Sequence, residues 1–519
     1  MLGGNRRETW GTKIGLILAL AGNAIGIGNF LRFPVQAAQN GGGAFIIPYF
    51  VALILMGIPL MWVECAIGRL GGRYGHGHAA GMFGLLWRHP FAKYLGMVGL
   101  VIPFTIALYY IYITGWTLAY GYFSLTGNYF GVTSREAMGA YLKGFQGVES
   151  NQYFSGAGTA YVFFLITLAL SMYIVYYGVR GGIETLAKVA MPILFLIGIA
   201  LMIRVLTLGT PDPSYPDRNV LNGLGFVWNP QPERLTDATI WLAAAGQIFF
   251  TLSIGTGCIS TYASYMREED DVALTGLSTA SLNELAEVVL GGTIAITASV
   301  VFFGLAETEA IAKGGAFNLG FQALPLIFQK IPLGHLFGAL WFVLLFLAAI
   351  TSVVALTQPV MALLQDGFGW SRWKATCVLL GGVFIMSQPV IFLLKHGFLD
   401  ELDFWVGSFG LVLFALIEAV LFAWVFGMEH GWAEITKGAA IPVPRVFYYV
   451  IKYVTPLFLL FILLAWAIQD VPSKILMVGV NPEDVAYLWG ARLMMVAILV
   501  GFALLVKAAT SRAERGVQP

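Results

Sequence analysis

The sequence has few charged residues. Lys, Arg, Asp and Glu make up 11% of its 519 residues, and 58% of the residues are hydrophobic. Soluble domains carry about 25% charged residues, so this chain lacks the polar surface that a water-soluble globule needs. We expect an integral membrane protein whose surroundings are the lipid bilayer, placed in a cell (inner) membrane as a multi-pass chain.

The sequence also lacks an excess of charge of either sign. Its formal net charge is +1, and it has neither the basic face that binds nucleic acid nor a block of acidic residues. We therefore expect no nucleic-acid partner, and other partners must be inferred from polar residues inside the apolar runs.

Cysteine is scarce. Cys65, Cys258 and Cys377 all fall within apolar runs, which gives no sign of a disulfide framework. The sequence also has no grouping of metal ligands, or of a nucleophile with a base, that would indicate an enzyme. The first apolar run has no small-residue cleavage pattern, so we expect a retained span rather than a removed signal.

Long apolar runs recur along the whole chain, and there are about twelve of roughly 20 residues, long enough to span a bilayer as helices. They begin near Lys13, Gly43, Ala92, Thr159, Glu184, Ala238, Thr275, Phe337, Lys374, Asp403, Val446 and Leu488. This predicts an all-α integral membrane protein. An even number of spans puts both termini on one side, and the basic residues beside the first and last spans predict that this side is cytoplasmic.

Two of these runs carry the same glycine-containing phrase, Ala24-Ile25-Gly26-Ile27-Gly28 and Ser253-Ile254-Gly255-Thr256-Gly257. Paired glycines loosen a helix, and loosened backbone in a bilayer must face a cavity, because lipid offers it no hydrogen-bond partners. A matched pair of interrupted spans points to a binding site at the midplane. Tight helix packing through small residues is the alternative reading of the phrase.

The positions of the two phrases predict an internal repeat. If spans one and six each open a repeat of five, the second repeat must be inverted. We expect a single transmembrane domain over 1–519, with a first repeat at 13–208, a second at 238–427, discontinuous helices 1 and 6, and two accessory helices at 446–508.

Polar residues gather around the two phrases. Asn23 and Asn29 flank the first, Thr251 and Ser253 flank the second, and later spans contain Asn283, Thr351 and Ser352. Amide, hydroxyl and freed carbonyl oxygens are ligands for a dehydrated alkali cation, and the start of a half-helix attracts a carboxylate. The residues thus favour a cation site beside a site for an anionic group, to which Tyr110 could add a hydroxyl donor, with Ile106, Phe250 and Leu356 as an apolar wall.

Several longer motifs occur in order. They are AGNAIGIGNFLRFP from Ala21, GGGAFIIPY from Gly41, QIFFTLSIGTG from Gln247, LNELAEVVLGG from Leu282 and TSVVALTQP from Thr351. Together they resemble the neurotransmitter:sodium symporter family over nearly the whole chain. The resemblance implies a sodium-coupled symporter of a neutral, hydrophobic amino acid that works by alternating access, with sodium ions as required co-substrates and a possible homodimer. An amino-acid-binding transceptor and a proton-coupled transporter are the alternatives.

The resemblance also implies site residues. The substrate site would consist of Asn23, Ala24, Ile27, Gly28, Ile106, Tyr110, Phe250, Thr251, Ser253, Thr256, Ser352 and Leu356. The first sodium would be held by Ala24, Asn29, Thr251 and Asn283, together with the substrate carboxylate. The second would be held by Gly22, Ile25, Ala348, Thr351 and Ser352.

Charged residues within the spans acquire roles from the same resemblance. Arg32 with Asp403 would close an outer gate, and Arg7 with Asp366, beside Trp10, would close the cytoplasmic side. Glu287 stands where chloride-independent members carry a carboxylate in place of a bound chloride, so we expect no chloride requirement.

One pocket position departs from the pattern. At Thr256 a bacterial member of the family carries a phenylalanine that contacts the substrate side chain, whereas Ile106 replaces a smaller valine on the opposite wall. We therefore expect a reshaped pocket, and the preferred amino acid does not follow from the resemblance.

Overall fold

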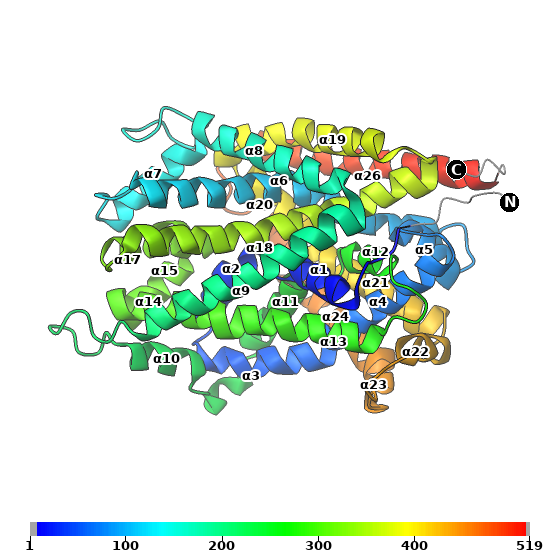
Figure 1. The fold of residues 1–519 in the computed structure, drawn as a ribbon, viewed down its shortest axis with the longest axis horizontal. Coiled ribbons are helices and arrows are strands. Elements are labelled where there is room, and N and C mark those ends of the chain that lie inside the picture. Colours follow the sequence, from blue (N-terminus) through cyan, green and yellow to red (C-terminus); the bar gives the residue numbers. More distant parts are fainter. Residues whose placement is uncertain (1–7, 515–519) are drawn as a thin grey trace.

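The computed structural model describes residues 8–514, which form helices and, within that range, no strand. Figure 1 shows the helices packed side by side along the long axis of the molecule. Helices α5 (Ala79–Leu86) and α22 (Met428–Thr436) lie at one end, with the C-terminal part of α26 (Val485–Glu514), and α7 (Arg135–Gln146) and α17 (Leu324–Gln329) lie at the other. We name these the predicted cytoplasmic and predicted extracellular ends.

The spanning helices begin close to the predicted positions. Their bounds are α1 Lys13–Ala24, α2 Ile27–Gln39, α3 Gly43–Ala52, α4 Ile58–Arg73, α6 Ala92–Thr126, α8 Gly158–Tyr176, α9 Thr185–Leu206, α11 Ala238–Leu252, α12 Cys258–Ala263, α13 Val272–Glu284, α14 Thr293–Phe303, α18 Gly334–Ala362, α19 Arg372–Phe392, α20 Phe398–Leu402, α21 Leu411–Val420, α24 Thr455–Gln469 and α26. Short π-helical turns join some of these into longer spans, among them η4 (Leu285–Gly292), η6 (Leu363–Gly367), η8 (Asp403–Gly410) and η10 (Val450–Val454).

The number of spans depends on how the broken helices are counted. Within the described residues, ten helices are long and apolar enough to cross a membrane, and the bent pair α1 and α2 makes eleven. Helix α11 has only 15 residues, and α12 follows it after a break. The all-α membrane architecture is confirmed, while the count of twelve and the repeats at 13–208 and 238–427 stay predictions.

Local sequence fixes several helix ends. Thr12 caps α1 by accepting a hydrogen bond from the Gly15 N–H at 3.0 Å. Gly127, with φ of +76°, ends the 35-residue helix α6 in the left-handed conformation that glycine adopts without strain.

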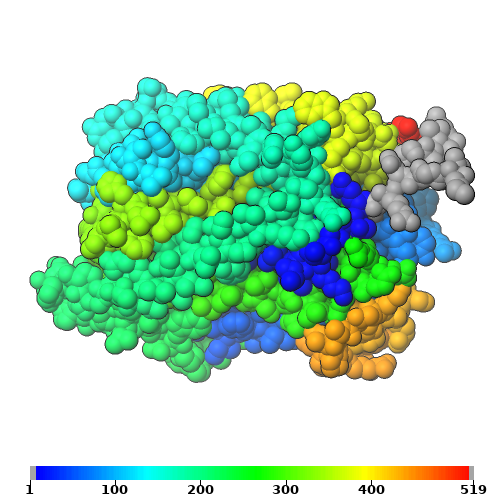
Figure 2. Space-filling view, viewed as in Figure 1, coloured from blue at the N-terminus to red at the C-terminus, as the bar shows by residue number. Residues whose placement is uncertain are grey.

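The two broken spans lie in the interior of the bundle. Helix α1 packs against α9, α13 and α18, and α18 makes its largest contact with α6. On the face shown in Figure 2, residues of α8 and α9 cover much of the surface, and the start of the described chain emerges beside them. Helices α9, α13 and α18 thus surround the first half of the first broken span.

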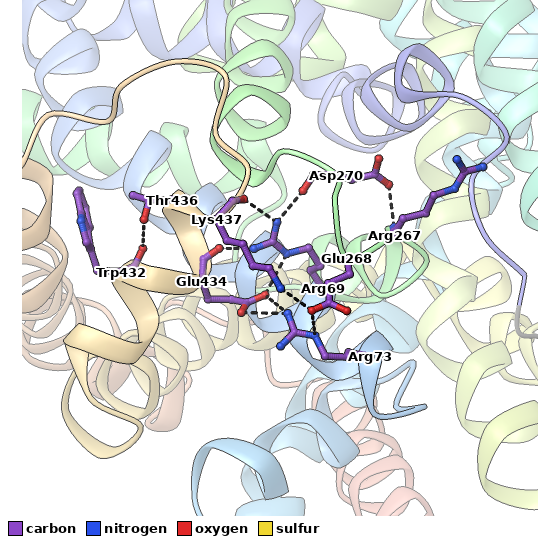
Figure 3. Close-up of polar contacts among 9 residues, drawn as sticks. All are labelled: Arg69, Arg73, Arg267, Glu268, Asp270, Trp432, Glu434, Thr436 and Lys437. Carbon is purple, nitrogen blue, oxygen red and sulfur yellow. Dashed lines mark hydrogen bonds and ion pairs between the residues drawn. The ribbon is translucent and has the colours of Figure 1, made fainter.

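A polar cluster, which we call the inner network, joins three segments at the predicted cytoplasmic end (Figure 3). Arg69 of α4 is 1% exposed and donates to Glu434 Oε1 of α22 at 3.0 Å and to the Asp270 carbonyl at 2.6 Å. Arg73 binds Glu434 at 3.0 Å and Glu268 at 3.5 Å, and Lys437 also pairs with Glu268. The network ties α4 to the 267–271 loop and to α22.

Candidate functional site

The first break is short and tightly enclosed. Only Ile25 and Gly26 separate α1 from α2, and the two helix axes differ by 49°. A Cβ at Gly26 would lie 2.7 Å from the Tyr110 hydroxyl, and one at Gly28 would lie 2.3 Å from the Phe250 ring. Both glycines are therefore required by close approach of neighbouring side chains.

The second break is longer, and the backbone conformation itself requires its glycines. Gly255 and Gly257 have φ of +76° and +78°, and Ser253 has φ of +55° without being glycine. Glu64 of α4, buried within the bundle, accepts a hydrogen bond from the Gly255 N–H at 2.7 Å. The partner that this intramembrane carboxylate needs is thus the freed backbone of the break.

Oxygen atoms from three spans converge beside the breaks. Asn29 Nδ2 lies 3.0 Å from Thr251 Oγ1, 2.8 Å from Asn283 Oδ1 and 3.0 Å from Glu287 Oε2. An amide nitrogen has only two hydrogens, so Asn29 Nδ2 can form full hydrogen bonds with only two of these three acceptors at a time. Gln247 Nε2 holds the other Glu287 oxygen at 2.6 Å. The cluster thus brings a hydroxyl, an amide and a carboxylate oxygen together around the Asn29 amide.

A second group of oxygens joins α1 to α18. Ser352 Oγ lies 3.3 Å from each of the Gly22 and Asn23 carbonyl oxygens and 3.2 Å from the Ala348 carbonyl oxygen. Thr351 Oγ1 also reaches the Ala348 carbonyl, at 3.0 Å. Hydroxyl and carbonyl oxygens of two helices thus gather without a charged side chain, which suits a weakly held monovalent cation.

A cavity of about 340 Å³ lies between the two breaks and extends past Arg32 and Asp403. Every residue predicted to contact the substrate lines it except Thr251, which is buried behind the wall in the oxygen cluster. The rest of the wall includes the apolar residues Leu31, Ile113, Leu399 and Leu411 and the charged residues Arg32, Asp400 and Asp403.

Two hydroxyl groups in the cavity have defined roles. The Ile27 N–H donates to Tyr110 Oη at 3.1 Å, so the hydroxyl proton of Tyr110 is not used in that bond. Thr256 Oγ1 donates to the Ser253 carbonyl at 2.7 Å and accepts from the Cys258 N–H at 3.2 Å. Because its hydroxyl is bonded within the break, Thr256 adds less polarity to the pocket than its residue type suggests.

The residues predicted to form the outer gate line the same cavity but form no ion pair within the part of the chain that the structure describes. The Arg32 guanidinium lies 4.2 Å from the centre of the Phe250 ring, and Asp403 accepts a hydrogen bond from Tyr109 at 2.7 Å. Their role as a closing pair stays a prediction.

At the predicted cytoplasmic end Trp10 packs against residues of and just after α12. Trp10 Nε1 donates to the Tyr262 carbonyl at 2.9 Å, and its ring packs edge-on against Tyr262 and Tyr265. Asp366 lies in η6, after α18. Its predicted partner Arg7 lies outside the described residues, so this gate also stays a prediction.

Sequence reasoning missed two residues that the site uses. Tyr109 holds Asp403, and Gln247 holds Glu287. Gln247 is a polar residue in an apolar span, which could have marked it. The sequence gives no such signal for Tyr109, because a tyrosine in an apolar span can face either the lipid or the protein core.

Comparison with known proteins identifies the family of this chain. The profile of the Sodium:neurotransmitter symporter family matches residues 7–133 and 130–511. An uncharacterised sodium-dependent transporter of Methanocaldococcus jannaschii is 29% identical over 511 residues, which are 96% of this chain and 97% of the relative. A sodium- and chloride-dependent glycine transporter 2 of Xenopus laevis is 25% identical over 517 residues, covering 88% of this chain and 64% of the relative.

A solved structure has the same fold. The crystal structure of MhsT in complex with L-phenylalanine superposes with a TM-score of 0.75 at 30% identity and covers 88% of this chain and 99% of MhsT. With a family profile that spans nearly all of its length, this chain belongs to the sodium:neurotransmitter symporter family.

Proposed function

We propose that the protein is a sodium-coupled symporter of a neutral, hydrophobic amino acid, with its substrate site in the cavity between the two helix breaks. The observation that carries this proposal is the position of the cavity, which is bounded by freed backbone of both breaks and directly adjoins an oxygen cluster. MhsT, which shares the fold, binds L-phenylalanine.

The cavity offers opposite ends for the two charges of an amino acid. The start of α2 at Gly28 and the hydroxyl proton of Tyr110 would receive the carboxylate. Backbone oxygens at Ala24, Phe250 and Thr251, with the Ser253 hydroxyl, would receive the ammonium group. No charged residue lies on the wall formed by Ile106 and Leu356, so a neutral, apolar side chain fits there.

Two sodium ions would bind as co-substrates. The first would use Ala24, Asn29, Thr251 and Asn283 with the substrate carboxylate, so that each ligand completes the site of the other and binding is coupled. The second would use Gly22, Ile25, Ala348, Thr351 and Ser352. Since these residues join α1 to α18, sodium there would hold the inner half of the first span in place.

Alternating access would then depend on the two gates. Arg32 and Asp403 would come together above a bound substrate, and opening at Trp10 would release it on the opposite side. Glu287 would supply the negative charge that chloride supplies in other members, so transport would need no chloride.

Uptake by proteoliposomes tests the function. An inward sodium gradient should drive saturable uptake of hydrophobic amino acids, and preloaded substrate should stimulate exchange, with equal rates when gluconate replaces chloride. Binding without exchange would identify a transceptor, and sodium-free uptake driven by a pH gradient would identify proton coupling. An absolute need for chloride would contradict the role of Glu287.

A further inference from the structure

The gate segment, residues 398–410 of α20 and η8, has two distinct faces. Leu399, Asp403 and Gly407, spaced four residues apart, line the cavity. Glu401 and Trp405, also four apart, occupy the other face, because residues at this spacing share one side of a helix. The segment thus separates the cavity from whatever lies behind it.

The helix behind the gate segment is α26, one of the two accessory helices, which packs against α20. Glu401 is 3% exposed and accepts hydrogen bonds from Arg492 Nε of α26 at 2.6 Å and from Trp405 Nε1 at 2.8 Å. Arg492 also donates to the Lys474 carbonyl at 2.6 Å. One guanidinium on α26 therefore links the gate segment to α25 (Val471–Ile475), the short helix that precedes α26.

A second contact joins the residues just before α20 to the start of α26. His396, two residues before α20, lies 2.6 Å from Asp484 and stacks on the Tyr487 ring with centroids 3.8 Å apart. Both contacts lie on the side of the segment away from the cavity. On the cavity side, the direct hydrogen bond of Asp403 is the one from Tyr109.

We propose that Arg492 is a positioning residue of the outer gate. Through Glu401, the accessory helix α26 holds the gate segment at the depth and rotation that place Asp403 beside Tyr109 and within reach of Arg32. The inference rests on the proposed function, since it assumes that Asp403 closes over a substrate. It assigns to the last span a part in substrate affinity, although that span contributes no residue to the cavity lining.

The test compares Arg492→Gln with Lys143→Gln. Lys143 forms an ion pair with Glu149 at the predicted extracellular end, and both side chains of this pair are exposed. At equal amounts of folded transporter, Arg492→Gln should raise the KM of sodium-driven uptake roughly five- to twentyfold, and Lys143→Gln should leave it unchanged. A merely structural role would lower the folded yield and the melting temperature but leave the KM of the folded fraction unchanged.

Two further variants keep the inference testable if Arg492→Gln does not fold. Trp405→Phe removes one donor from Glu401 and should raise KM less than Arg492→Gln does. Glu401→Gln combined with Arg492→Gln removes the unpaired buried charge and should recover part of the KM. If Arg492→Gln and Trp405→Phe both keep the wild-type KM, the inference is overturned. If Arg492→Gln does not fold, a wild-type KM in Trp405→Phe alone overturns it. Absence of sodium-dependent uptake by the wild type would instead contradict the proposed function.

Discussion

The two ends of the helix bundle differ in how their charges are satisfied. At the predicted cytoplasmic end, Arg69 is buried and bonded to a carboxylate and to backbone carbonyls of two other segments. At the predicted extracellular end, Arg32 and Asp403 line the cavity and, within the described residues, form no ion pair with each other.

The two ends therefore differ in what a rearrangement requires. Separating α4 from α22 would break several hydrogen bonds and ion pairs of the inner network, whereas pairing of Arg32 with Asp403 would form a new one.

The largest expected effect comes from breaking the inner network. Arg69→Ala would leave Glu434 with one cation fewer and leave the Asp270 carbonyl unpaired, and removing one partner of a buried pair costs about 3 to 5 kcal/mol. Arg73→Ala, which removes a more exposed cation bound to the same carboxylate, should cost about 1 kcal/mol or less. Thermal unfolding in detergent measures both, and equal losses would show that burial does not distinguish the two ion pairs.

The next-largest effect is expected from adding a methyl group to the wall of the cavity. Gly28→Ala would place a methyl group against the Phe250 ring, and overpacking costs about 1 to 3 kcal/mol, or roughly five- to hundredfold in substrate affinity. Gly381→Ala is the control, because a Cβ there meets nothing within 4 Å. Substrate affinity is measured by binding of radiolabelled amino acid in the presence of sodium. An unchanged affinity in Gly28→Ala would show that the substrate does not bind in this cavity.

Selectivity should change through Thr256. Thr256→Phe would fill the wall beside the second break and should disfavour tryptophan relative to leucine and methionine by about tenfold. Thr256→Ser keeps the hydroxyl that bonds to the Ser253 carbonyl and should preserve the rank order. Competition binding with the three amino acids measures the rank order of affinity. An unchanged order in Thr256→Phe would show that the substrate side chain does not contact residue 256.

The smallest effect sharpens the outer side of the comparison. Tyr109→Phe removes the hydrogen bond to Asp403, and a net loss of about 1 kcal/mol should favour pairing of Asp403 with Arg32. Substrate affinity should therefore rise a few-fold, roughly fivefold at most. Tyr112→Phe on the same helix, whose hydroxyl donates to the Gln146 carbonyl, serves as the control. A lower affinity in Tyr109→Phe would mean that Tyr109 holds Asp403 in its closing position.

Much of the site could be predicted because its residues lie beside local features of the sequence. Asn29 and Thr251 flank the two glycine phrases, and the two spans that contain the phrases begin near the expected positions. The inner network could not be predicted, since Arg69 and Glu434 are 365 residues apart and only packing of α4 against α22 brings them together. The same holds for Arg492 and Glu401.

The sequence by itself determined the membrane setting, the helical class and the two breaks, because these follow from composition, run length and the conformational freedom of glycine. The tertiary structure decided which polar groups remain available at the breaks. It engages the Thr256 hydroxyl within the second break and Asp403 with Tyr109, and it leaves Arg32 over an aromatic ring. The reason is that hydrogen bonding at a break depends on which side chains other helices bring there, and no local pattern records those distances.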